Sequence, residues 1–274
     1  MLFLTLPLAF ALSAALSCIP DFDAVVARAM RRFFTAMQAL LFKTVGEDSV
    51  RFAPALSLLF VTAMACILGG VLGAVHPLLC APLIAPLIPL PGLIRNALAV
   101  RETLEEGACA SDEERAGYER QIMDAIGVLA EQCAQQLFVP LLLSTLLLPL
   151  HLAPAAFGML YALRLLAEEC VWARKANAFV NRIGDALMTL CVIPTAALCG
   201  TEMGMALRAR RRGAKDVLLS AVGVDPTFKS GHRPVTGDIS QSCLCVCVAL
   251  GLMYAVVTAV MFVLLARFAA ASMG

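Results

Sequence analysis

The chain has 274 residues, of which 61% are hydrophobic and 15% charged, and its mean hydropathy is +0.85. Soluble domains are nearer half apolar and a quarter charged, so the composition excludes a soluble globular protein and predicts an integral membrane protein. The formal net charge of +1 excludes a nucleic-acid binder driven by bulk charge. The 11 cysteines lie mostly inside apolar runs, so we interpret them as reduced, small apolar side chains rather than a disulfide framework.

The first predicted elements are one span and one amphipathic helix. Residues 1–18 are apolar and uncharged, and no basic residue precedes them as in a secretory signal, so we interpret them as an uncleaved span. Residues 21–42 have apolar positions at helical spacing beside a basic face, which is typical of a helix at the membrane interface or on the membrane bundle. The predicted apolar stripe is Phe22, Val25, Val26, Ala29, Met30, Phe33, Met37, Leu40 and Leu41.

Two further apolar stretches follow. Residues 52–75 contain no charge and predict a regular span. Gly69 and Gly73 have the spacing that allows close helix approach, which in an apolar segment indicates packing more often than a dimer interface. Residues 77–94 contain five prolines, which remove backbone donors and interrupt helices. We expect a kinked or partly unwound return segment that is buried in protein or lines a cavity.

The second half of the chain alternates polar and apolar segments. A polar helix is expected to run into the membrane at residue 137, and residues 137–166 predict a helical hairpin with its turn near 148–154. Residues 186–199 are shorter than a span, so we expect them to dip into the membrane and return, or to lie buried. Residues 200–242 form a basic cytoplasmic loop before the last span, 243–266. The predicted fold class is all-α: a single, polytopic membrane helical bundle with proline-broken or re-entrant segments and amphipathic interfacial helices.

The basic residues predict the orientation. Lys and Arg accumulate on the cytoplasmic side of membrane proteins, and every Lys and Arg except Arg267 falls in segments that can share one side. This places the N-terminus and the C-terminus in the periplasm of a bacterial inner membrane and most loops in the cytoplasm. The expected partners are membrane lipids, with anionic headgroups at the basic loop, and a partner membrane or envelope protein; no nucleic acid is expected.

The sequence contains few motifs that indicate catalysis or ligand binding. The sequence has no phosphate-binding Gly-rich loop, and the histidines are too far apart in sequence to suggest a metal site, so no cofactor and no metal are predicted. Carboxylates at membrane depth are costly and often functional. The candidate polar pocket comprises Glu131, Gln135, Arg164 and Asp185, which flank the broken segments. The alternative interpretation is that these side chains are hydrated and paired at the cytoplasmic interface.

An ordered series of short motifs over residues 90–200 resembles one superfamily of membrane proteins. The motifs are Arg95-Asn96-Ala97-Leu98-Ala99-Val100, Ala130-Glu131-Gln132, Phe138-Val139-Pro140-Leu141, Tyr161-Ala162 and Val192-Ile193-Pro194. The chain is similar in this series to adenosylcobinamide-phosphate synthases (CobD/CbiB) and to the AmpE inner-membrane proteins of the same superfamily. The AmpE proteins are associated with β-lactamase induction and cell-envelope stress.

The polar positions of the synthases are not kept. Their Asn and Asp correspond to Gln132 and Gln135, and a pair of Asp corresponds to Leu187 and Met188. The resemblance therefore implies an AmpE-like protein in cell-envelope signalling, without a catalytic residue. The alternative is a synthase that forms an amide bond with ATP in cobalamin biosynthesis. A second alternative is a small transporter or scaffold, suggested by the proline-broken segments.

Overall fold

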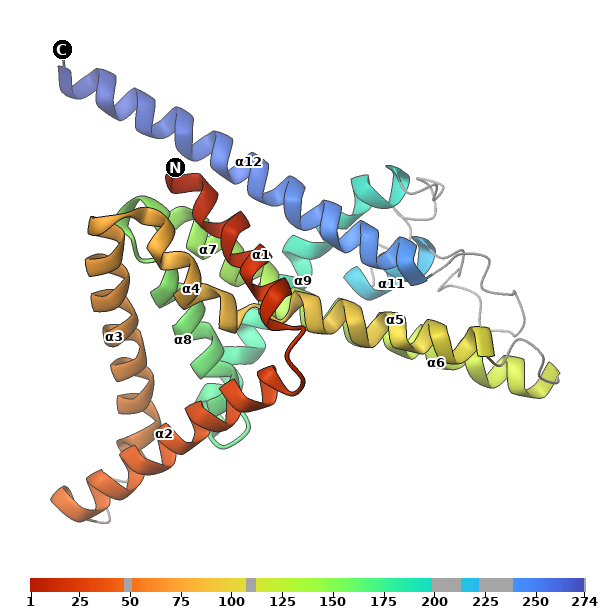
Figure 1. Ribbon diagram of the computed structural model, residues 1–274, viewed down its shortest axis with the longest axis horizontal. Coiled ribbons are helices and arrows are strands. Elements are labelled where there is room, and N and C mark those ends of the chain that lie inside the picture. Colours follow the sequence, from red (N-terminus) through yellow and green to blue (C-terminus); the bar gives the residue numbers. More distant parts are fainter. Residues whose placement is uncertain (47–50, 107–111, 199–212, 222–238, 274) are drawn as a thin grey trace. The chain divides into compact units, whose positions relative to one another are not determined.

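The computed structural model describes residues 1–46, 51–106, 112–198, 213–221 and 239–273, and these residues form helices without a β-strand. The all-α prediction is confirmed. The helices in chain order are η1 (Leu2–Leu4), α1 (Thr5–Leu16), α2 (Phe22–Val45), α3 (Ala53–Val75), η3 (Pro77–Cys80), α4 (Ala81–Ile84), η4 (Ala85–Leu87), α5 (Leu90–Glu106), α6 (Asp112–Cys133), η5 (Ala134–Phe138), α7 (Val139–Leu147), η6 (Leu148–Leu150), α8 (Ala153–Leu166), α9 (Val171–Leu198), α11 (Ala214–Ala221) and α12 (Ile239–Met273) (Figure 1).

The apolar helices are those of a multi-pass membrane protein. Within the described residues, four stretches are long and apolar enough to cross a membrane: Ala53–Val75, Pro77–Val100, Gln121–Leu150 and Ile239–Ser272. Leu2–Leu16 and Ala153–Leu166 are apolar but shorter. The first helix is thus shorter than the predicted span 1–18, because it ends before Pro20 and Asp21, which has a left-handed backbone.

The chain divides into two compact units. The first comprises Met1–Pro91, Pro140–Val180 and Val260–Gly274, and the second comprises Gly92–Val139 and Asn181–Ala259. In the first unit, the segment after α3 is broken as predicted, into η3, α4 and η4, and Ile88 is extended before α5 begins. A proline occupies the first or second position of each of these short helices, because a first helical turn needs no backbone donor. The helix α1 packs along these short helices (Figure 1).

The helices α3 and α8 pack against each other in the first unit, and the η6 turn reverses the chain before α8. A Cβ atom at Gly69 would lie 2.7 Å from the carbonyl oxygen of His151, and one at Gly73 would lie 2.5 Å from the imidazole Cγ of the same residue. The two glycines thus let the η6–α8 turn approach α3, so their spacing serves packing within the chain.

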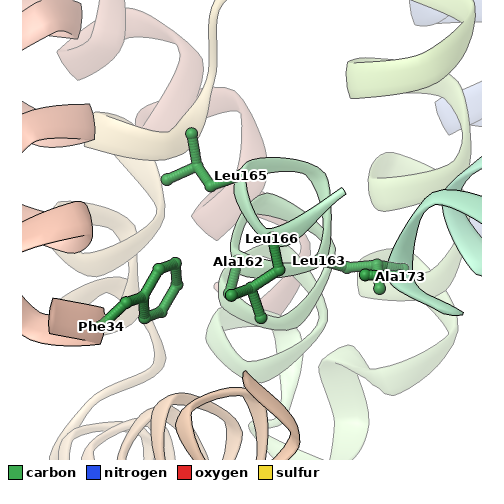
Figure 2. Close-up of a cluster of buried hydrophobic side chains, with 6 residues drawn as sticks. All are labelled: Phe34, Ala162, Leu163, Leu165, Leu166 and Ala173. Atoms are coloured by element: carbon green, nitrogen blue, oxygen red, sulfur yellow. The ribbon is translucent and has the colours of Figure 1, made fainter. Parts of the chain in front are cut away.

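The core of the first unit shows which edge of α2 is buried in protein. Phe34 is the buried side chain of this helix, although it lies outside the predicted stripe, while Val25 and Leu40 are exposed. Figure 2 shows the Phe34 ring directed toward Ala162 and Leu166 of α8. Phe33 and Met30 are partly buried against the same cluster. The helix α2 packs against α8 through the edge that carries Phe34. This buried edge lies beside the centre of the apolar stripe on α2.

The second unit is built on α6, the π-helical turn η5, α9 and α11. The polar helix α6 continues without a break through η5 into α7, as predicted. The helix α11 packs on α6, and the hydroxyl of Ser242 donates a 3.3 Å hydrogen bond to the carbonyl of Leu218. Residues 186–198 are the second half of the continuous helix α9, with Pro194 inside it, rather than a separate segment beginning at 186. The basic loop 200–242 lies largely outside the described residues.

Candidate functional site

The second unit contains a polar pocket of about 570 Å³, which is within the usual size range of small-ligand sites. Its walls come from α6 with η5, from α9 and from the start of α11. The lining residues are Asp124, Gly127, Val128, Glu131, Ala134, Gln135, Asn181, Arg182, Asp185 and Lys215. We call this cavity the second-unit pocket.

The wall from α6 and η5 presents polar side chains at helical intervals. Asp124, Glu131 and Gln135 share one face with the small residue Gly127, because positions three and four apart are neighbours on a helix. The side-chain amide of Gln135 donates a 3.1 Å hydrogen bond to the Glu131 carboxylate. This bond fixes the direction of the carboxylate and leaves its remaining acceptor positions for other donors.

The wall from α9 approaches η5 very closely. A Cβ atom at Gly184 would overlap the carbonyl oxygen of Ala134, so only glycine permits this backbone contact. Asn181, Arg182 and Asp185 lie on either side of this contact and line the pocket. The carboxamide oxygen of Asn181 is buried and has no hydrogen-bond partner among the described residues. A buried acceptor without a partner is costly, so this wall favours a bound donor or water.

The third wall comes from the chain that enters α11. Gly213 has a φ of +104°, and a Cβ atom there would lie 2.9 Å from a carboxylate oxygen of Asp185. Lys215 lies over Gly127: its Nζ and Cε atoms are 2.8 Å from the position that a Cβ atom would take at that glycine. The ammonium group therefore lies one helical turn from Asp124 in one direction and one turn from Glu131 in the other.

The pocket thus combines groups of both charges. Asp124, Glu131 and Asp185 supply carboxylates, and Arg182 and Lys215 supply cations. Such a lining can bind a polar ligand that carries both a positive and a negative group, since each charge finds an opposite one. Among the described residues, no three His, Cys, Asp or Glu side chains come together as a metal site requires.

Three of the four side chains predicted for a polar pocket line this one: Glu131, Gln135 and Asp185. Arg164 does not. It lies in the first unit, in the last turn of α8, where Tyr161 and Glu168 are its electrostatic neighbours. The four residues were predicted to share a pocket because each flanks a broken segment. A position beside a broken segment does not indicate to which unit the helix belongs.

The broken segments 77–94 and 137–166 line a different cavity. They contribute Leu83, Leu87, Pro154 and Gly158 to a separate apolar pocket of about 260 Å³ in the first unit. Part of their irregular backbone is hydrogen-bonded within that unit. Ser13, for example, donates to the carbonyl of Ile88.

Sequence reasoning missed four lining residues: Asp124, Asn181, Arg182 and Lys215. Helical spacing from Glu131 offers a signal for Asp124, and spacing from Asp185 offers one for Asn181. Lys215 was interpreted as part of a basic loop that sets topology, and nothing in its local sequence indicates that it contacts Gly127.

Comparisons with known proteins do not indicate a ligand, so the chemistry of the pocket is argued from its own side chains. No protein-family model matches the chain, and neither a curated protein nor a solved structure is significantly similar to it. Two cations, three carboxylates and two side-chain amides are the groups available to a ligand. They favour recognition of a charged small molecule over binding of an apolar one.

Proposed function

We propose that this chain is an AmpE-like inner-membrane protein that acts in cell-envelope signalling associated with β-lactamase induction. In this proposal the second-unit pocket binds a small polar ligand of mixed charge, and binding rather than chemistry is its task. The observation that carries the proposal is the gathering of Glu131, Gln135 and Asp185 with Arg182 and Lys215 around one cavity.

The position of the resembling motifs supports this proposal. The Ala130-Glu131-Gln132 motif and Gln135 correspond to the polar series of the synthases, and two of these residues line the pocket. The pocket therefore includes positions at which the synthases that the chain resembles carry polar residues. A ligand site retained at this place agrees with the AmpE-like interpretation.

The replaced residues argue against synthase chemistry. Amide formation needs groups that can accept a proton, and a neutral amide at Gln135 cannot take the place of a carboxylate. Leu187 and the buried Met188 stand where the synthases have Asp.

A complementation assay separates the two functions. The chain is expressed in a bacterium that lacks its own adenosylcobinamide-phosphate synthase, and growth is tested with cobyric acid as the corrinoid source. We expect no growth, with a true synthase as the positive control. Growth supported by this chain would overturn the non-enzymatic proposal and establish the synthase alternative.

A second assay tests whether the pocket is used. β-Lactamase induction is measured in a Gram-negative host that depends on this chain, with Lys215→Ala and Glu131→Gln at matched expression. Both substitutions should reduce the response, because each removes a charge that faces the cavity. The control is Lys43→Ala, on α2 of the first unit and outside the lining. Equal responses from all three variants would contradict a role for the pocket.

The proposed location is the bacterial inner membrane, with both termini in the periplasm. The support is the positive-inside distribution, in which Arg267 is the sole basic residue after the last predicted span. Six crossings satisfy this distribution: four by the long apolar stretches and two by Leu2–Leu16 and Ala153–Leu166. In this arrangement α9 begins and ends on the cytoplasmic side.

A further inference from the structure

The helix α9 has two apolar faces, and one of them is exposed. Its buried face includes Ala173, Gly184, Met188 and Val192. On the opposite side lies a row that we call the α9 stripe: Trp172, Phe179, Ile183, Ala186 and Leu190. Spacings of seven, four, three and four residues place these side chains in one line along a helix.

The exposure of the stripe is large. Trp172 is 42% exposed, Phe179 is 65% exposed and Leu190 is 57% exposed. Leaving side chains of this size in water is unfavourable, at about 25 cal/mol for each Å² of apolar surface. A continuous exposed apolar face of this kind indicates a contact with a membrane or a partner.

The composition of α9 does not fit a membrane-spanning helix. It is not among the four helices that are long and apolar enough to span, and its first four turns contain Arg174, Lys175, Arg182 and Asp185. Carrying these charges through hydrocarbon would cost several kcal/mol. A helix of this composition is instead suited to lie parallel to the membrane plane.

We infer that α9 is an interfacial helix, with the α9 stripe in the outer part of the acyl-chain region and its basic edge at anionic lipid headgroups. Lys175 lies along one edge of the stripe, about 60° around the helix from its centre, which places its ammonium group at the headgroup level. Arg182, farther round on the same side, lines the second-unit pocket. Trp172 begins the stripe, and Trp is enriched at membrane–water interfaces.

The charge pattern favours lipid over a partner protein. Lys is depleted at protein–protein interfaces, whereas a basic edge beside an apolar face is the pattern of helices that bind anionic membranes. Both units include apolar stretches suited to a bilayer. A bilayer is thus a surface that α9 can contact without an additional protein component.

The native fluorescence of the chain provides a direct test, because Trp172 is its single tryptophan. The full chain is reconstituted into phosphatidylcholine vesicles whose acyl chains carry bromine near the headgroup end or near the methyl end. We expect a loss of Trp172 fluorescence with both lipids, larger with bromine near the headgroup end, because interfacial helices insert only about 5–10 Å. A matched control, Trp172→Phe with Val256→Trp in α12, should show the opposite order of losses.

The outcomes are distinct. Undiminished Trp172 fluorescence in both lipids, with the control tryptophan quenched, would overturn the inference. In that case, a long-wavelength emission maximum of Trp172 would show that its side chain is exposed to water. A short-wavelength maximum would show that protein covers it. A larger loss with bromine near the methyl end would also overturn it, because the helix would then lie too deep to be interfacial.

The basic edge is tested with mixed vesicles. Bromine is placed either on phosphatidylglycerol or on phosphatidylcholine at the same molar fraction, and the two losses are compared. We expect the brominated phosphatidylglycerol to quench Trp172 more, and Lys175→Glu to remove this difference. Lys43→Glu, on α2, should leave it unchanged. Equal quenching by the two lipids in the unsubstituted chain would contradict the anionic-lipid contact.

Discussion

The hydroxyl of Ser13 on α1 donates a 2.7 Å hydrogen bond to the carbonyl oxygen of Ile88, the residue at which the broken segment is extended. Near the other end of this segment, the hydroxyl of Thr5 lies 3.2 Å from the carbonyl oxygen of Pro77. The Thr5 hydroxyl also lies 2.8 Å from the carbonyl oxygen of Leu2 in its own turn, so Ser13 is the clearer donor from α1 to a backbone group that the prolines leave outside regular helices. This is the condition under which irregular backbone is tolerated among apolar surroundings.

Ser13→Ala should destabilise the first unit by about 1 kcal/mol, because the buried carbonyl of Ile88 loses a donor. Ser17→Ala is the matched control, since the Ser17 hydroxyl donates within its own helix turn, 2.8 Å from the carbonyl of Ala14, and is exposed. Thermal unfolding in detergent measures both. Equal shifts of the unfolding temperature would contradict a structural role for the bond to Ile88.

Alanine substitutions at two neighbouring glycines of α3 should change the stability of the protein in opposite directions. Gly69→Ala should destabilise by about 1–3 kcal/mol, because its Cβ atom would lie 2.7 Å from the carbonyl oxygen of His151. Gly70→Ala should stabilise by up to about 1 kcal/mol, since no atom lies within 4 Å of its Cβ position and alanine favours helix. Unfolding in detergent tests the pair, and a loss of stability in both variants would contradict the packing of the turn on α3.

Two glycines beside the second-unit pocket should also differ in their tolerance of alanine. Gly184→Ala should destabilise by about 1–3 kcal/mol, because the backbone of Ala134 must move away from the new methyl group. Gly127→Ala meets only the flexible end of Lys215, so it should displace that side chain with little effect on stability. Unfolding temperatures are compared with those of Gly251→Ala, whose Cβ position is open.

Cys170 should react slowly with alkylating reagents at neutral pH. Burial raises the pKa of its thiol above the ordinary value, and the adjacent Glu169 carboxylate raises that pKa further. Because the thiolate is the nucleophile, the rate in a variant whose sole cysteine is Cys170 should keep rising above the pH at which ordinary thiols level off. Adding Glu169→Gln should speed the reaction at pH 8. An unchanged rate would show that the carboxylate has no influence.

Reporter fusions test the proposed orientation. Fusions at Gly107, Asn177 and Gly231 should report the cytoplasm, and a fusion at Gly274 should report the periplasm, because basic residues gather on the cytoplasmic side. A periplasmic signal at Asn177 would mean that α9 begins on the opposite side. A periplasmic signal at Gly231 would contradict the cytoplasmic position of the loop before α12.

The sequence by itself determined the properties that depend on local chemistry. Apolar run length predicted α3 and α12, since about 20 apolar residues are needed to cross a bilayer. Proline predicted the interruption between Pro77 and Ile88, because a missing backbone donor acts within one turn. Helical spacing placed Glu131 and Gln135 side by side on a continuous helix, and the structure joins them by a hydrogen bond.

Only the tertiary structure decided which helices meet. Periodicity located an apolar face on α2 but not its buried edge at Phe34, because that edge is defined by contact with α8. Arg164 and Asp185 have similar sequence settings, yet they belong to different units. Lys215 and Gly127 are 88 positions apart, and their contact follows from α11 packing on α6. Such contacts depend on surface shape along whole helices, and shape complementarity is not encoded in any local pattern.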